Sequence, residues 1–110
     1  MVTQATQNTL AQAQAYQQQA QNILIQKENV SIQLAEINNA LGELEKTTET
    51  EIFKMSGPVL IKSTKTSVKK ELSEKQELLN LRMKTLEKNE KKLREELEEI
   101  REKLTKETHR

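Results

Sequence analysis

Apolar residues recur in alternating steps of three and four along both halves of the chain, and this repeat limits the possible folds most strongly. Ten positions from Ala13 to Leu44 follow the spacing, and nine of them are apolar or aromatic. In the second half, eight of the ten positions from Leu72 to Leu104 are apolar. A 3–4 repeat of this length is typical of the seam of a left-handed coiled coil. We therefore expect two long helices that pair along these positions.

The composition agrees with a mostly α-helical chain. Its 110 residues include only two Gly and one Pro, so the backbone has few places to turn sharply. Aromatic residues make up 2%, too few to anchor a compact core. The expected architecture is an antiparallel coiled coil of two arms with one connection.

Several classes of protein are excluded by what the sequence lacks. The chain has no Cys, which excludes disulfides and thiolate metal sites. No apolar run approaches the roughly 18 residues of a membrane span, and the first residues do not resemble a signal peptide. The net charge is +1, and no basic patch is interleaved with aromatics. We expect a cytoplasmic protein that binds neither nucleic acid nor membranes.

An enzyme is also disfavoured. The single histidine is His109, and the chain has no Cys or Asp to orient it. Gly42 and Gly57 are isolated, so there is no glycine-rich phosphate loop. The Glu residues of the second arm are interleaved with basic residues, as on a solvated helix face. We expect no catalytic, cofactor-binding or metal-binding residues.

A short β-hairpin is predicted between the arms. Ile52-Phe53-Lys54-Met55 and Val59-Leu60-Ile61-Lys62 are β-prone runs on either side of Ser56-Gly57-Pro58. Thr64 is the expected N-cap of the second helix, with Thr66 and Ser67 as alternatives. The predicted divisions are an N-terminal helix in 1–47, a hairpin in 48–65 and a C-terminal helix in 66–110. The first residues of the N-terminal segment are expected to be either disordered or weakly adhesive.

The hairpin is expected to be an oligomerisation site. Apolar residues lie on both of its faces, and an isolated two-stranded hairpin is only marginally stable in water. Joining several hairpins into a closed intersubunit β-barrel would bury these residues and the strand edges. The alternative is that they only pack on their own helices. The predicted interface consists of Ile52, Phe53, Met55, Val59, Leu60 and Ile61.

These residues together resemble the β-type subunit of prefoldin, in its archaeal form. The resemblance rests on Tyr16-Gln17-Gln18-Gln19, on the hairpin segment from Ile52 to Lys62, and on Glu71-Leu72 at the start of the second arm. The aromatic-Lys-x-x-Gly-x-x-aliphatic-aliphatic-Lys pattern within the hairpin is its most specific part.

The resemblance implies a hetero-hexamer in which two prefoldin α-type subunits join four β-type subunits. Such a complex holds its coiled coils on a double β-barrel. It captures unfolded proteins without ATP, uses no cofactor, and passes its clients to a group II chaperonin.

The free ends of the two arms are the expected client-binding surface. Small residues in the first arm are expected to leave apolar residues of the second arm partly uncovered. One alternative is that these side chains only close the last heptads, and another is that the whole chain is a passive scaffold or tether. The predicted client-binding residues are Val2, Leu10, Ala13, Leu97, Ile100 and Leu104.

Overall fold

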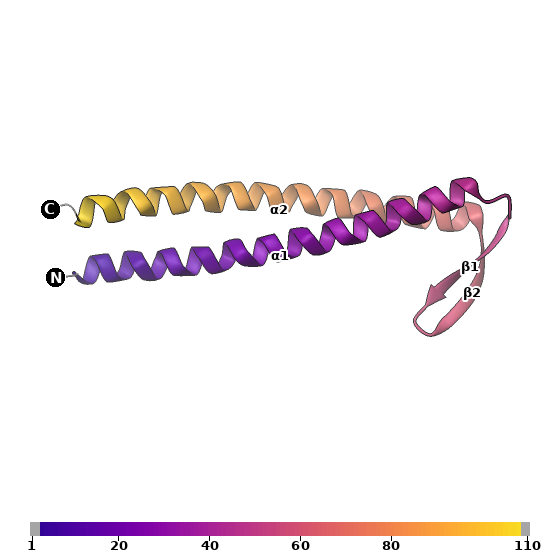
Figure 1. Ribbon diagram of the computed structural model, residues 1–110, viewed down its shortest axis with the longest axis horizontal. Helices are drawn as coiled ribbons and strands as arrows, with labels where there is room; N and C mark the ends of the chain where they lie inside the picture. The colour runs from indigo at the N-terminus through magenta and orange to yellow at the C-terminus, as the bar shows by residue number, and fades with distance from the viewer. Residues whose placement is uncertain (1–2, 109–110) are drawn as a thin grey trace. The chain divides into compact units, whose positions relative to one another are not determined.

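The computed structural model describes residues 3–108, which form two long helices joined by a β-hairpin (Figure 1). None of the helices in this range is long and apolar enough to cross a membrane. The two-helix fold with one hairpin is confirmed, whereas the intersubunit barrel remains a prediction. The elements in order are α1 (Gln4–Lys46), β1 (Glu51–Ser56), β2 (Val59–Thr64) and α2 (Lys65–Thr108).

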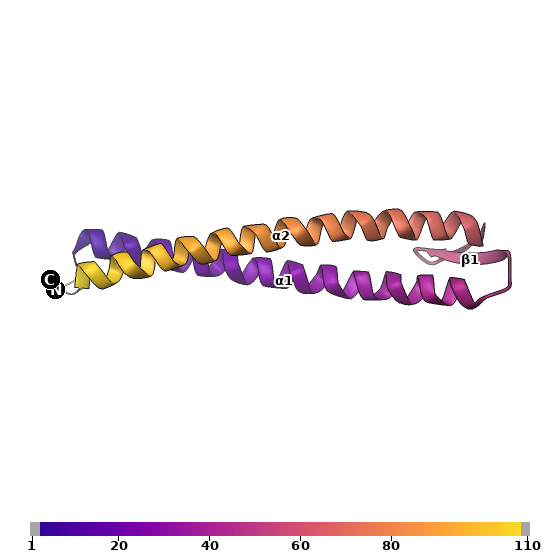
Figure 2. The same cartoon turned by 90° about the horizontal axis from the view of Figure 1, so that it is seen from above.

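The chain divides into two compact units. The hairpin unit comprises residues 30–83, and the terminal unit comprises residues 1–29 together with 84–110. Each unit therefore contains one part of α1, one part of α2 and a seam between them. Figure 2 shows that, in the hairpin unit, the hairpin begins where α1 ends and returns where α2 begins.

The buried apolar side chains all belong to the predicted 3–4 repeat. Within each helix they are seven residues apart, which places one of them at the helix pair every two turns. The remaining positions of the repeat are half-buried. The repeat therefore forms the seam, as predicted. The buried apolar residues are Val30, Ile37 and Leu44 on α1 and Leu86, Leu93 and Ile100 on α2.

Two polar contacts set the helix register within the hairpin unit. Gln76 Nε2 donates a hydrogen bond to Asn38 Oδ1 at 2.6 Å, and Lys69 Nζ lies 2.6 Å from Glu45 Oε1. Moving seven residues forward on α1 moves the partner seven residues back on α2, as antiparallel helices require. The hydrogen bond and charge of Lys69 lower the pKa of Glu45. This pair therefore stabilises the fold at neutral pH, and its contribution is lost as the pH falls through the lowered pKa.

A charged pair occupies the seam of the terminal unit. Lys27 Nζ donates to both carboxylate oxygens of Glu90, at 3.2 and 3.4 Å. Both residues are positions of the 3–4 repeat, and their side chains are 26% and 19% exposed. Opposite charges in a seam favour the one register that brings them together.

Removing one member of this pair should destabilise the chain more than removing both. Glu90→Leu leaves the ammonium of Lys27 half-buried without its carboxylate, which should cost about 1–3 kcal/mol. The double variant Lys27→Leu/Glu90→Leu should recover that loss, because apolar side chains can replace a buried ion pair without loss of stability. Urea unfolding followed by circular dichroism measures both values. A Glu90→Leu variant as stable as the parent chain would contradict this account.

Side-chain hydroxyls cap the first turns of both helices. Thr64 Oγ1 accepts a hydrogen bond from Ser67 N at 3.1 Å, which confirms the predicted N-cap of α2. Thr3 Oγ1 accepts one from Thr6 N at the same distance. The helix α1 begins at Gln4, directly after this capping threonine.

The hairpin turn is tighter than the sequence suggested. Ser56 pairs with Val59, so the loop consists of two residues, Gly57 and Pro58, rather than three. Gly57 has φ of 59°, a value that glycine adopts without strain. Proline restricts φ to about −65°. A positive φ followed by a negative one is the pattern of a type II′ turn, whose twist matches that of the two strands.

Candidate functional site

The strand register places three of the six predicted interface residues on one face of the hairpin and the other three on the opposite face. Met55 lies opposite Leu60, and Phe53 lies opposite Lys62. Because paired residues share a face, these side chains form one surface, called here the outer face. Phe53 is 66% exposed, Met55 75% and Leu60 64%. Among the described residues 3–108, the apolar side chains of the outer face are therefore largely exposed.

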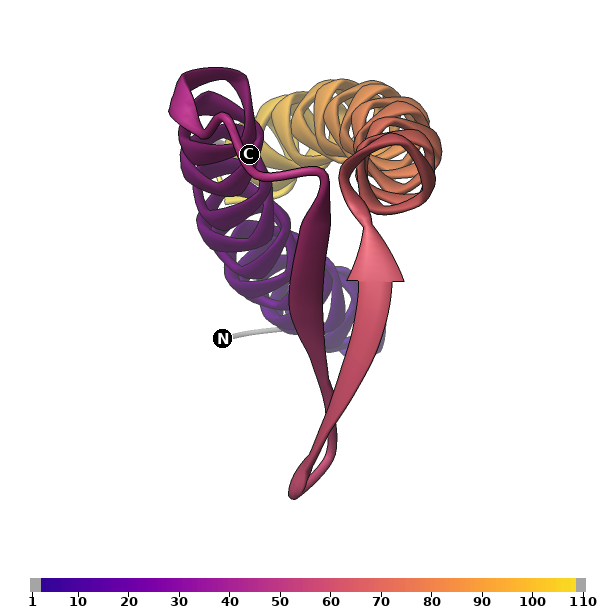
Figure 3. The same cartoon turned by 90° about the vertical axis from the view of Figure 1, so that its right-hand side faces the viewer.

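The other face of the hairpin is partly held by the helices. Lys54 Nζ donates to the carboxylate of Glu71 on α2 at 3.1 Å, and Ile52 is half-buried. Val59 and Ile61 on the same face are exposed. Figure 3 shows both strands extending away from the adjacent ends of α1 and α2. Packing on the chain's own helices thus accounts for the partial burial of Ile52, but it leaves the other five predicted interface residues exposed.

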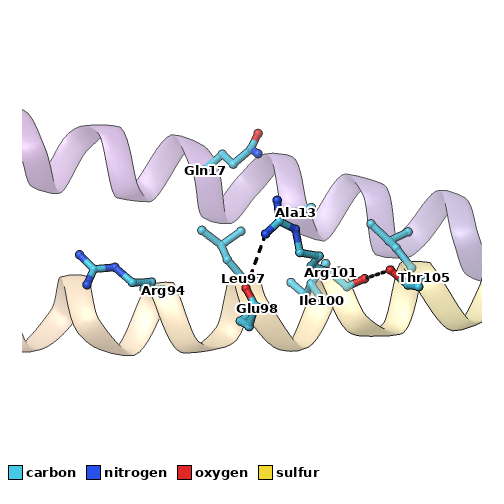
Figure 4. A pocket seen from close by; sticks show the side chains of 9 residues that line it. Ala13, Gln17, Arg94, Leu97, Glu98, Ile100, Arg101 and Thr105 are labelled. Carbon is cyan, nitrogen blue, oxygen red and sulfur yellow. Dashed lines mark hydrogen bonds and ion pairs between the residues drawn. The ribbon is translucent and has the colours of Figure 1, made fainter.

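A groove opens beside the seam of the terminal unit. It has a volume of about 450 Å³ and is lined by Ala13 and Gln17 on α1 and by residues of α2 between Arg94 and Thr105. Figure 4 shows Leu97 pointing toward the part of α1 that carries Gln17 and Ala13. The methyl group of Ala13 is too small to fill the space that a larger seam residue would occupy. The groove exists because the small side chain of Ala13 on α1 lies among large aliphatic residues of α2.

The two walls of the groove differ in charge. Residues 4–26 of α1 contain no charged side chain. The α2 wall carries Arg94, Glu98 and Arg101. Arg101 Nη1 lies 3.8 Å from Glu98 Oε2, and Arg94 Nη2 lies 3.5 Å from Glu90 Oε1. The groove thus combines apolar side chains with two arginines on one wall.

The predicted client-binding residues divide into four groups. Ala13, Leu97 and Leu104 are half-buried and line the groove. Leu10 is exposed but does not line it, and Val2 lies outside the described residues. Ile100 lines the groove but is only 7% exposed. The expectation that Ile100 is partly uncovered is therefore wrong.

Two threonines explain why the seam is better closed than expected. Thr6 and Thr9 are 6% and 2% exposed. Thr9 Oγ1 donates to the backbone oxygen of Ala5 at 2.9 Å, and Thr6 Oγ1 is 3.0 Å from Thr3 Oγ1. A hydroxyl that bonds to its own helix can be buried without leaving an unpaired polar group. Small polar residues therefore close this end of the seam.

Sequence reasoning missed five residues of the groove, none of which is a position of the 3–4 repeat. They are Gln17, Arg94, Glu98, Arg101 and Thr105. One signal was available, because two arginines seven residues apart lie on the same side of a helix. Residues 3–108 contain no cluster of His, Cys, Asp or Glu that could hold a metal ion.

Comparison with known proteins decides the family. Residues 7–110 match the sequence profile described as "Prefoldin subunit". The chain belongs to the prefoldin subunit family. The resemblance inferred from the hairpin segment is thereby confirmed, and family membership makes the chain a chaperone subunit rather than an enzyme.

Individual relatives agree with the β type of this family. The chain is 43% identical over 99 residues to a prefoldin subunit beta of Archaeoglobus fulgidus, and 42% identical to one of Thermococcus onnurineus. Each match covers 89% of this chain and 85% of the relative. The crystal structure of the prefoldin beta subunit from Thermococcus strain KS-1 superposes with a TM-score of 0.87 at 36% identity. That superposition covers 96% of this chain and 94% of the other.

Proposed function

We propose that the chain captures unfolded proteins in the groove of the terminal unit, without ATP, as part of a larger prefoldin complex. The observation that carries the proposal is the groove itself, where half-buried Leu97 and Leu104 face the small side chain of Ala13. An open cleft with apolar lining suits segments that expose apolar side chains, as unfolded proteins do.

The α1 wall of the groove tolerates clients of varied charge. The α1 wall is neutral, so its side chains repel neither acidic nor basic segments. One groove offers only a small apolar area, so each contact is weak. Several copies on one assembly convert weak contacts into useful avidity without any new contact within a groove.

The outer face of the hairpin is the proposed assembly site. Its three large apolar residues are exposed in the single chain, and burying them between chains is favourable. By analogy with the family, the partners are prefoldin α-type subunits, two for every four chains of this type. The same analogy places the complex in the cytoplasm and makes a group II chaperonin the recipient of its clients.

A test of aggregation separates a chaperone from a passive tether. The chain is assembled with an α-type subunit, and a chemically denatured protein is diluted into the solution without nucleotide. Light scattering should stay low in the presence of the complex and rise in its absence. A complex that assembles normally but leaves the scattering unchanged would show that the chain is only a scaffold.

A further inference from the structure

The two flanks of the seam in the terminal unit carry opposite charge. On one flank the groove presents two arginines and one glutamate. On the other flank, a hollow of about 330 Å³ beside Tyr16 presents two glutamates and one lysine. The two flanks of the seam therefore differ in net charge, which is positive in the groove and negative in the hollow. The charged residues are Arg94, Glu98 and Arg101 in the groove, and Glu96, Glu99 and Lys103 in the hollow.

The groove arginines are only loosely engaged within the chain. Arg94 lies 3.5 Å from the carboxylate of Glu90, which has a closer partner in Lys27 at 3.2 Å. Arg101 lies 3.8 Å from Glu98, and both members of that pair are exposed. Exposed ion pairs at such distances contribute little. Either guanidinium can therefore turn to an incoming carboxylate without losing a strong contact.

The geometry points to a preferred class of client segment, an inference that rests on the proposed capture function. We propose that the groove selects unfolded segments in which an apolar residue has acidic residues close by on both sides. Arg94 and Arg101 are two helical turns apart, about 10 Å along α2. An extended chain covers that distance in roughly three residues. The apolar side chain enters beside Ala13 and Leu97 while flanking carboxylates reach the two guanidinium groups.

Three synthetic peptides test the preference. They share one leucine-containing core and differ only in flanking residues, which are Glu, Gln or Lys. Fluorescence anisotropy measures their affinity for the assembled complex. Exposed charge pairs are worth about 0.2–1 kcal/mol, which is about 1.4- to fivefold in affinity for each arginine. The Glu peptide should bind most tightly and the Lys peptide least, and the difference should shrink in high salt.

Matched variants assign the preference to the groove. Arg101→Gln should reduce the ratio of Glu-peptide to Lys-peptide affinity, whereas Lys103→Gln, which removes the same charge from the opposite flank, should not. Equal binding of all three peptides, or a ratio that Arg101→Gln leaves unchanged, would overturn the proposal. If all three peptides bound equally and Ala13→Leu, which fills the groove, abolished that binding, only the charge preference would be overturned. Capture in the groove would still stand. Binding that Ala13→Leu does not affect would overturn the capture function as well.

Discussion

Replacing Phe53 or Leu60 by glutamate is expected to split the assembly while leaving both helices folded. Both side chains are more than half exposed in the single chain and lie on the same face of the hairpin. Burying a charge in their place between chains should cost at least about 3 kcal/mol per site. That corresponds to a rise of about 100-fold or more in the dissociation constant. Sedimentation velocity measures the size of the assembly, and circular dichroism measures the helix content.

Leu24→Glu is the matched control for this experiment. Leu24 is 56% exposed, close to the values for Phe53 and Leu60, but it lies on α1 outside the hairpin. The control should sediment as the parent complex does. If Phe53→Glu and Leu60→Glu together still sedimented like the parent, the outer face would not be the assembly site.

Filling the groove is expected to abolish client capture and stabilise the chain at the same time. In Ala13→Leu the added isopropyl group is expected to occupy the groove that Leu97 and Leu104 also line. Because that burial removes apolar area from water, the free energy of unfolding should rise by about 1–2 kcal/mol. Suppression of aggregation should fall several-fold. Opposite changes in stability and activity would separate loss of a binding surface from loss of folding.

Ala11→Leu supplies the comparison for the filled groove. Ala11 is exposed, two residues from Ala13 on the same helix, and does not line the groove. The substitution adds the same apolar group outside the groove. It should leave suppression of aggregation intact. Equal losses for the two variants would attribute the effect to added surface hydrophobicity rather than to a filled site.

Local sequence patterns predicted the elements of the fold because those elements depend on neighbouring residues. The 3–4 repeat identified the seam positions that are buried, among them Val30 and Leu93. The Gly57-Pro58 step marked the hairpin turn, and the hydroxyl of Thr64 marked the start of α2. Each of these signals acts within a few residues, so a single sequence contains it.

The groove could not be predicted in the same way because it depends on how the two helices are aligned along their axes. Ala13 faces the segment around Leu104, and shares the groove with Leu97, only in the alignment that also joins Lys27 to Glu90. That pair spans 63 residues, and no local pattern predicts such a contact. Burial of Thr9 was missed for a related reason, since threonine is usually exposed unless its hydroxyl is bonded.

The most direct test of the account is to record where an unfolded client touches the chain. A photoreactive residue is placed at Gln17 in the groove wall or, as a control, at Leu78, which is exposed on α2 outside both the groove and the hairpin. Each assembled complex is irradiated after a denatured protein is added without nucleotide. The account predicts abundant cross-links to the client from position 17 and few from position 78. Equal cross-linking from both positions, or cross-links only from position 78, would contradict capture in the groove.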